Sequence, residues 1–355
     1  MMKNPFKNKN ILITGHTGFK GSWLTAWLYT LGANITAISK DVPTKPAHYN
    51  LMRGFIKNDI TEDLANYDRI FQIINEAKPD YIFHLAAQPI VLTSYNDPYL
   101  TFQSNAVGTL NILETLRVLN PNCTAVIITS DKCYENIEQS IGYKETDRLG
   151  GKDPYSSSKA CAEIIIKGYY ESFFSQPASN VKIASSRAGN VIGGGDWAEH
   201  RIVPDCIKAW SEKKPVILRN SLSTRPWQHV LEPLGGYLTL ANQLNESSNL
   251  NGESFNFGPD DKNTYSVGNL VSEISKKWKG AQWVDETHND NKKYEAGLLS
   301  LNCSKALKLL KWKSIMSFEK TAGLTGEWYY EYYNNSPEDA IKLTLSQIEE
   351  YNSIL

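Results

Sequence analysis

The chain has 355 residues, 41% of them hydrophobic and 21% charged, so it is long enough and apolar enough to bury a large core. Its 37 basic residues nearly cancel its 38 acidic ones, and no stretch is strongly basic, so we expect no nucleic-acid partner. No apolar run reaches membrane-spanning length, and the N-terminal residues lack the apolar core of a signal peptide. The five cysteines form no CxxC pair and the six histidines show no ligand spacing. We therefore expect reduced thiols, no metal site and a cytoplasmic location.

The first predicted unit is a strand that ends in a glycine turn and opens a helix. Residues 10–14 form a short apolar strand, and Gly15, Gly18 and Gly21 follow at intervals of three. A helical pattern starts at once and stops at Gly32. Backbone N–H groups and the positive end of the helix dipole converge at such a turn, which predicts a binding site for a cofactor diphosphate. Simple strand–helix packing is the alternative, because the spacing is not the G-x-G-x-x-G of most dinucleotide-binding dehydrogenases.

Apolar strands then alternate with amphipathic helices as far as residue 186. This alternation predicts a Rossmann-type, doubly wound parallel sheet with right-handed crossovers. Nearly continuous apolar strands, such as 81–85, are typical of a parallel sheet that is covered on both faces. We expect strands at 34–39, 55–60, 81–85, 125–129 and 181–186, and helices over roughly 64–74, 98–119 and 155–173.

The pattern becomes irregular after Arg187, which predicts a second, smaller and discontinuous lobe. We expect short helices or strands there, and residues 255–258 as a strand that rejoins the main sheet. The expected division is a cofactor-binding domain over 1–188, rejoined by about 230–258, and a substrate-binding lobe formed by 189–229 and 259–355. Because ligands of open α/β sheets bind at the carboxyl ends of the strands, the active site should lie between these parts.

The residue after the second strand bears on the choice of cofactor. An acidic side chain there can hydrogen-bond an adenosine ribose, and Asp41 is the candidate. Lys40 beside it leaves the choice between NAD and NADP open at this point.

Two groups of polar residues are expected at the same sheet edge. Ser130, Asp131 and Lys132 follow a buried strand, and Tyr155 stands one helical turn before Lys159 on one helix face. A nearby ammonium favours a phenolate, which can take a proton from a substrate hydroxyl. A Tyr-x-x-x-Lys pair is usually a solvated helix face, but its place after the glycine turn and the Ser-Asp strand end favours catalysis here.

Several segments together resemble the extended short-chain dehydrogenase/reductase superfamily, namely 14–21, 84–88 and Tyr155-x-x-x-Lys159. More narrowly, the chain is similar to the CDP-glucose 4,6-dehydratase family over roughly residues 8 to 330. The segments that carry this similarity are 15–24, 129–136, 153–160, 187–198 and 225–233. Ser130-Asp131-Lys132 is the most specific piece, because related dTDP-glucose and GDP-mannose dehydratases have Asp-Glu or Ser/Thr-Glu pairs there.

The resemblance implies a three-step reaction with one tightly held NAD. Hydride leaves C4 of the sugar, water is lost across C5 and C6, and the same hydride returns to C6. The nucleotide-sugar substrate would be CDP-glucose, and the product would be CDP-4-keto-6-deoxyglucose, a precursor of dideoxy sugars in bacterial lipopolysaccharide. A homodimer through the helices at 98–119 and 155–173 is also implied only by the resemblance.

The resemblance assigns a role to each of the five catalytic candidates. Tyr155 matches the base for C4 oxidation, and Lys159 matches the residue that holds the nicotinamide ribose and lowers the pKa of the tyrosine. Ser130 should hydrogen-bond the C4 oxygen. Asp131 matches the acid that protonates the departing C6 hydroxyl, which requires a raised pKa. Lys132 stands where the glutamate-bearing relatives have the C5 base, and the alternative is that it only neutralises Asp131 or a phosphate.

The resemblance also implies the ligand-binding residues. The expected NAD-binding set is Gly15, Thr17, Gly18, Phe19, Gly21, Asp59, Ile60, Ala86, Ala87, Tyr155 and Lys159. The expected substrate-binding set is Gln88, Asn190, Arg201 and Arg225, with a structural ion pair as the alternative for Arg225. Leu92, where the family commonly has arginine, and His200, where aspartate is usual, depart from the pattern beside the expected substrate cleft. His84 is expected to be a buried structural histidine.

Two other functions remain open from the sequence. A nucleotide-sugar epimerase, or a dehydratase acting on another nucleotide sugar, would share the fold and the oxidation chemistry. An epimerase, however, needs no acid at Asp131, because it reduces the carbon that it oxidised. A non-catalytic NAD-binding regulator on the same scaffold is the alternative from another class, and the presence of Tyr155 and Lys159 argues against it.

Overall fold

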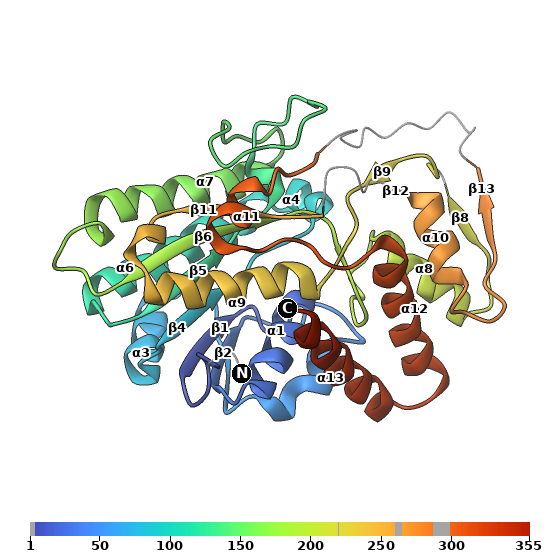
Figure 1. Ribbon diagram of the computed structural model, residues 1–355, viewed down its shortest axis with the longest axis horizontal. Coiled ribbons are helices and arrows are strands. Elements are labelled where there is room, and N and C mark those ends of the chain that lie inside the picture. Colours follow the sequence, from blue (N-terminus) through green and yellow to red (C-terminus); the bar gives the residue numbers. More distant parts are fainter. Residues whose placement is uncertain (1–3, 219, 260–264, 287–298) are drawn as a thin grey trace.

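The computed structural model describes residues 4–218, 220–259, 265–286 and 299–355. Its centre is a seven-stranded sheet in the order β11-β6-β5-β4-β1-β2-β3, in which every neighbouring pair is parallel (Figure 1). The strands are β1 (Asn10–Thr14), β2 (Asn34–Ser39), β3 (Asn58–Thr61), β4 (Tyr81–His84), β5 (Thr124–Ile128), β6 (Lys182–Ala188) and β11 (Ser254–Phe257). The predicted doubly wound sheet is confirmed, and β11 joins it beside β6 as expected.

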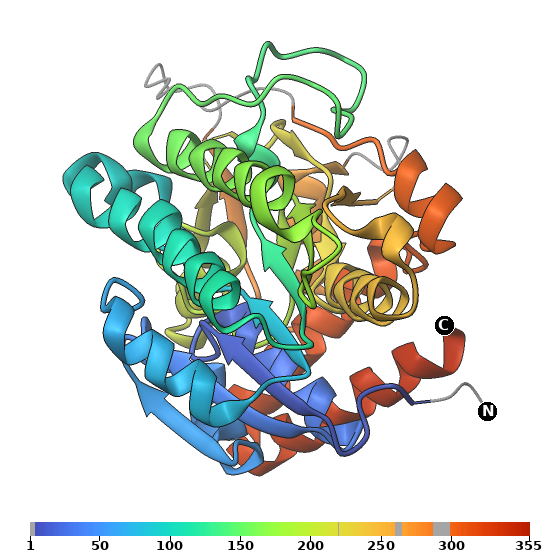
Figure 2. The same cartoon turned by 90° about the vertical axis from the view of Figure 1, so that its left-hand side faces the viewer.

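Helices cover both faces of the sheet, as Figure 2 shows from the side. One apolar cluster joins the sheet to α3 (Tyr67–Ala77), α6 (Gly108–Leu119) and α7 (Pro154–Tyr169). A larger cluster on the other face includes α1 (Phe19–Thr30) and α9 (Leu231–Glu246). Both faces of the strands are therefore buried, which explains why their sequences are continuously apolar rather than alternating.

The chain order of the strands places a crevice at the middle of the sheet. From β1 the chain winds outward through β2 to β3, and it then returns to β4 on the other side of β1. The crossovers therefore run in opposite directions from β1 and β4, and their carboxyl ends border the topological switch point where ligands of such sheets bind.

A second group of elements lies beside one end of the sheet, to the right in Figure 1. Its helices are α8 (Ile202–Ser211), α10 (Val267–Ser275) and α12 (Phe318–Asn334). Two small strand pairs accompany them: β8 (Val216–Leu218) with β13 (Trp283–Asp285), and β9 (Thr224–Arg225) with β12 (Tyr265–Ser266). Parts of the predicted 259–355 segment, namely 260–264 and 287–298, lie outside the described residues.

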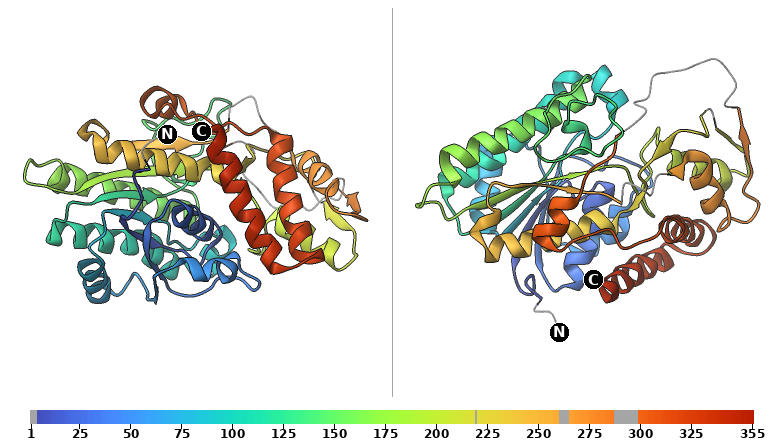
Figure 3. Two further views of the ribbon diagram at one scale, coloured as in Figure 1. Left: turned by 60° about the horizontal axis from the view of Figure 1, so that its bottom comes forward. Right: turned by 45° about the horizontal axis from the view of Figure 1, so that its top comes forward.

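The last helix, α13 (Pro337–Ile354), connects this group to the sheet domain. It lies beside α12 in both views of Figure 3. It also contacts α1, where the rings of Trp27 and Tyr351 meet edge to face and the Trp27 indole donates a hydrogen bond to Asn352. Tyr351 donates a hydrogen bond to the buried carboxylate of Glu232 at the start of α9. The C-terminal residues thus stabilise the helix that carries the glycine turn.

Three element boundaries differ from the sequence prediction for local reasons. The strand predicted at 55–60 begins only at Asn58, because Arg53–Phe55 form a 3-10 turn. The helix predicted over 98–119 is divided into α5 (Pro98–Phe102), a π turn at Gln103–Val107, and α6. The helix predicted over 155–173 likewise ends in a π turn at Tyr170–Phe174. Hydrophobic periodicity does not register such insertions.

Trp328 on α12 offers a test of how these parts are held together. Its side chain is fully buried, its indole N–H donates to Thr344 on α13 at 2.8 Å, and its ring stacks on Tyr332. Trp328→Ala should lower the free energy of unfolding by about 3–5 kcal/mol, because a large cavity opens between the helices. Chemical denaturation measures this loss, and Trp283→Ala, at a side chain that is 37% exposed, is the matched control with a change below about 1 kcal/mol. Equal losses in the two variants would contradict this account of the packing.

Candidate active site

The glycine turn between β1 and α1 contains two kinds of glycine. Gly15 has a φ of +79°, and a Cβ there would lie 2.6 Å from the backbone nitrogen of Ala86. A Cβ on Gly21 would lie 2.1 Å from the Gly15 carbonyl oxygen. A Cβ on Gly18 would meet only that same oxygen, at 3.3 Å, and otherwise open space. Gly15 and Gly21 are therefore required by packing, whereas the space at Gly18 forms a cradle beside the N-terminus of α1 that fits a diphosphate.

The other end of the expected cofactor site is a hydrogen-bonded network around Asp59. Its carboxylate contacts the His16 imidazole at 3.0 Å and accepts a hydrogen bond from the Tyr49 hydroxyl at 2.5 Å. The other ring nitrogen of His16 contacts Ser39 at the end of β2. Burial lowers the pKa of His16, although Asp59 opposes the shift. Asp59 thus fixes the glycine turn against β2 and β3, a structural role beside the cofactor role expected of it.

The residues that follow β2 favour an unmodified ribose. Asp41 is exposed, and its backbone carbonyl accepts a hydrogen bond from the hydroxyl of Thr17 at 2.6 Å. Lys40 forms an ion pair of 2.7 Å with Asp63, which raises the pKa of Lys40. The ammonium of Lys40, which left the choice between NAD and NADP open, is therefore paired with a carboxylate of the protein.

Ser130 and Asp131 lie directly after β5, at the start of a 3-10 turn over Asp131–Cys133. Both side chains are buried, and the Ser130 hydroxyl donates to the Asp131 carboxylate at 2.8 Å. Burial raises the pKa of Asp131, even though the positive charge of Lys132, the Ser130 hydrogen bond and the charge of Lys20 oppose the shift. A carboxyl group with a raised pKa is suited to donate a proton near neutral pH.

Tyr155 and Lys159 lie on α7, which begins at Pro154 with Asp153 as its cap. Both side chains are buried. A hydrogen bond with Ser130 lowers the pKa of Tyr155, whereas the charge of Asp131 raises it. Burial raises the pKa of Tyr155 to about 12 and lowers the pKa of Lys159 to about 8. The two predicted constellations are thus brought together by the ends of β5 and α7.

Lys132 and Lys20 are the two further amines near Asp131. Lys132 is half-buried, and its charge is the largest opposing influence on the pKa of Asp131. Lys20, in the first turn of α1, donates a hydrogen bond of 3.4 Å to Tyr237, and burial lowers its pKa to about 8. No role was predicted for Lys20 from the sequence, although its place between the turn glycines Gly18 and Gly21 is a signal that could have identified it.

The four expected substrate-binding residues occupy different settings. Gln88 is part of a loop structure, because its amide donates to Thr101 and accepts from the backbone of Ile90. Arg201 forms an ion pair of 2.7 Å with Asp196, and its positive charge opposes the rise in the pKa of Tyr155. Asn190 lies half-buried between β6 and β7 (Val191–Ile192), and Arg225 lies in β9, where its guanidinium donates to the Thr224 carbonyl.

The remaining expected contacts surround the glycine turn. Ala86, after β4, donates its backbone N–H to the Thr14 hydroxyl. Ala87 follows it in the chain, Phe19 begins α1 and Ile60 lies in β3, and these three residues are partly buried. His84 is buried between the hydroxyls of Thr14 and Thr109, which confirms its structural role. Among the described residues, no group of histidine, cysteine and acidic side chains could hold a metal ion.

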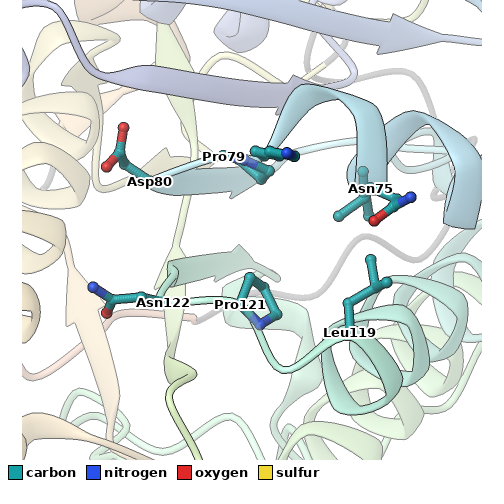
Figure 4. A pocket seen from close by; sticks show the side chains of 8 residues that line it. Asn75, Pro79, Asp80, Leu119, Pro121 and Asn122 are labelled. Carbon is teal, nitrogen blue, oxygen red and sulfur yellow. The ribbon is translucent and has the colours of Figure 1, made fainter.

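A pocket of about 320 Å³ lies at the opposite edge of the sheet (Figure 4). It is bounded by residues that precede β4 and β5, such as Asp80 and Asn122, and by the ends of α3 and α6. The residues that line it include no candidate catalytic group, so it does not compete with the site at the carboxyl ends. None of the helices formed by the described residues combines the length and the hydropathy that a membrane span requires.

Comparisons with known proteins show the family to which the chain belongs. A family model described as GDP-mannose 4,6 dehydratase matches residues 12–324. CDP-glucose 4,6-dehydratase of Salmonella typhimurium is 40% identical over 99% of this chain and 98% of its own length. CDP-paratose 2-epimerase of Salmonella typhi is 28% identical over 72% of this chain and 81% of its own. A solved structure of dTDP-glucose 4,6-dehydratase from Bacillus anthracis in complex with NAD superimposes with a TM-score of 0.72 at 21% identity, covering 93% of this chain and 99% of the other.

Proposed function

Because the chain belongs to the GDP-mannose 4,6-dehydratase family of nucleotide-sugar enzymes, we propose that it dehydrates CDP-glucose to CDP-4-keto-6-deoxyglucose with NAD as its cofactor. The observation that carries the proposal is a buried, protonatable Asp131 that lies beside Tyr155. An enzyme that only oxidises and reduces C4 has no use for an acid at this place. The CDP-glucose relative, similar over nearly its whole length, supports the choice of nucleotide and sugar.

The cofactor proposal rests on the cradle at Gly18. NAD would supply the acceptor and the donor for the hydride that leaves C4 and returns to C6. The backbone around Gly18 and Phe19 would hold the diphosphate, and Asp41, exposed after β2, would take the ribose. The pairing of Lys40 with Asp63 supports NAD rather than NADP. Lys159 would bind the ribose hydroxyls on the nicotinamide side.

The chain's own residues divide the proton transfers between them. Tyr155 would take the proton of the C4 hydroxyl while Ser130 hydrogen-bonds the C4 oxygen. Lys132 would remove the C5 proton, which the new C4 carbonyl makes acidic. Asp131 would then protonate the C6 hydroxyl as it leaves as water. Arg201, Asn190 and Arg225, on the side of the second lobe, would bind the nucleotide diphosphate.

The direct test is to incubate the protein with CDP-, dTDP-, UDP- and GDP-hexoses and measure the products by mass. We expect loss of one water from CDP-glucose, and little or none from the other nucleotides. Loss of water from a different nucleotide sugar alone would correct the substrate and keep the reaction. No loss of water from any of them, with interconversion of hexoses instead, would identify an epimerase.

Gly18→Val tests the cofactor cradle. The valine side chain should occupy the space that a diphosphate needs, while the backbone angles of Gly18, φ −75° and ψ 165°, suit valine. We expect an unchanged fold and an NAD affinity at least about tenfold weaker by calorimetry. Gly54→Val, at a position where a Cβ meets nothing within 4 Å, is the control and should bind normally. Unchanged affinity in Gly18→Val would show that the turn serves packing alone.

We also propose that the enzyme is a cytoplasmic homodimer of deoxysugar biosynthesis for lipopolysaccharide. All five cysteines are free thiols, which suits a reducing compartment. The helices at 98–119 and 155–173 expose apolar side chains that a second copy would cover. These side chains are Tyr99, Phe102, Val107, Val118, Ile164 and Phe173. Light scattering should give twice the chain mass, and a monomer mass would contradict the dimer.

A further inference from the structure

Glu163 is a buried carboxylate on the same helix face as the two catalytic residues of α7. It follows Lys159 by one helical turn and Tyr155 by two, so the three side chains are stacked along α7. It is 3% exposed and accepts hydrogen bonds from Thr129 at the end of β5 and, at 2.9 Å, from Ser185 on β6. A third hydroxyl, Ser254 on β11, lies at 3.4 Å. One side chain therefore ties α7 to three adjacent strands.

Arg187 completes this connection with an opposite charge. Its guanidinium forms a buried ion pair of 2.7 Å with Glu163 and donates to the Tyr134 hydroxyl at 2.8 Å. It also lies 4.9 Å from the centre of the Tyr134 ring. Because both charges are buried and hydrogen-bonded, the pair fixes one arrangement of α7 on the sheet, and removing one partner would leave the other uncompensated.

The ammonium of Lys159 lies over the strand residue next to the one that Glu163 contacts. Its Nζ lies 3.5 Å from the Ile128 carbonyl oxygen, whereas Glu163 binds the hydroxyl of Thr129. The titratable and charged groups that interact with this pair of side chains come from four elements. They are Lys20 of α1, His84 of β4, Cys133 of the 3-10 turn, and Arg187 of β6. Glu163 is the carboxylate with the largest favourable effect on Lys159.

We propose that Glu163, held by Arg187, is a positioning residue for Lys159 and Tyr155. It sets the register of α7 on the sheet, and it keeps a permanent negative charge one turn below the ammonium, so that Lys159 stays charged although it is buried. The inference rests on the proposed function, because it assumes that charged Lys159 binds the cofactor ribose and favours the phenolate of Tyr155.

Burial lowers the pKa of Lys159 to about 8 even though the charge of Glu163, the largest opposing influence, raises it. A lysine with a lowered pKa is charged below that value and loses its charge as the pH rises through it. Without the carboxylate, the ammonium should therefore be lost at a still lower pH. Activity and cofactor binding that require the charged lysine should then decline earlier on the alkaline side.

The test is Glu163→Gln, which keeps the shape and the hydrogen-bonding capacity but removes the charge. The alkaline limb of the kcat/KM profile should move to lower pH by about one unit or more. The pH dependence of NAD affinity, measured by calorimetry without substrate, should move by the same amount. Glu163→Asp keeps the charge on a shorter side chain, so its limb should stay near the wild-type position while kcat falls.

Two further variants keep the test decisive. Glu163→Gln/Arg187→Met removes both charges, so it should fold even if the single variant does not, with the same alkaline shift. Glu253→Gln, at a surface pair with Lys305, is the matched control and should leave the profile in place. An unshifted limb in the double variant, or in Glu163→Gln where it folds, would overturn the inference, and so would equal shifts in Glu163→Gln and Glu163→Asp. Failure of the wild type to release water from CDP-glucose would instead overturn the proposed function.

Discussion

Asp131→Asn is expected to oxidise CDP-glucose at C4 and then to stop before water is lost. Asparagine keeps the shape of the side chain but has no proton to give to the departing C6 hydroxyl. Loss of a general acid costs about 10²–10⁴-fold in rate, so the keto-deoxy product should form at about that reduced rate. The CDP-4-ketoglucose that accumulates is measured by trapping with borodeuteride and mass spectrometry.

The pH dependence of the wild type checks the same assignment. Burial raises the pKa of Asp131, so its acidic form persists to higher pH than that of an ordinary carboxyl group. The dehydration step should decline as the pH rises through this raised pKa, because only the protonated group can donate. In Asp131→Asn that dependence should disappear. Formation of the product by Asp131→Asn at the wild-type rate would show that another group is the acid.

Tyr155→Phe should block the reaction earlier, before any ketone forms. Phenylalanine fills the same buried space, but it has no hydroxyl to take the C4 proton, so oxidation should slow by about 10²–10⁴-fold. Trapping with borodeuteride should therefore find no accumulated 4-keto sugar, in contrast to Asp131→Asn. NAD affinity by calorimetry should remain close to that of the wild type, which separates lost chemistry from lost binding.

The two variants also make it possible to test whether Lys132 is the base that removes the C5 proton. Exchange of the C5 proton with heavy water needs the 4-keto sugar and a base, so it should proceed in Asp131→Asn and be absent in Tyr155→Phe. Lys132→Ala in the Asp131→Asn background should suppress that exchange if Lys132 is the base. If the C5 proton still exchanged normally, Lys132 would not be the base. Its role would then be that of a charge partner, whose positive charge lowers the pKa of Asp131. If Tyr155→Phe accumulated the 4-keto sugar to the level of Asp131→Asn, the assignment of Tyr155 as the base for C4 oxidation would be wrong.

The fold could be predicted where hydrophobic patterns are strong and local. The strands at 34–39 and 81–84 and the helix after Gly18 follow directly from runs of apolar residues with clear stops. The pattern missed the late start of β3 and the π turn at Gln103–Val107. In the π turn, Asn105 donates hydrogen bonds to Gln88 and Ser158. These residues are distant from Asn105 in the sequence, so hydrophobic periodicity cannot predict the contacts.

The candidate site shows the same division. Asp131 and Tyr155 could be placed together from the sequence, because Asp131 follows a strand and Tyr155 begins the next helix, and both positions lie at the carboxyl edge of a parallel sheet. Lys20 and Glu163 could not, because their importance depends on contacts with Tyr237 and Arg187, which lie far along the chain. The hydrogen bonds from His16 and Tyr49 to Asp59 are likewise tertiary contacts, so the structural role of Asp59 could not be predicted from sequence patterns.

Oxidation, loss of water and reduction should all occur within a single turnover on one bound NAD. To test this, CDP-glucose that carries deuterium at C4 is converted, and the position of the label in the product is determined by NMR and mass spectrometry. We expect the deuterium to reappear at C6 of CDP-4-keto-6-deoxyglucose. Deuterium that is returned to C4, or lost from the sugar, would contradict it and would identify an epimerase or an ordinary dehydrogenase.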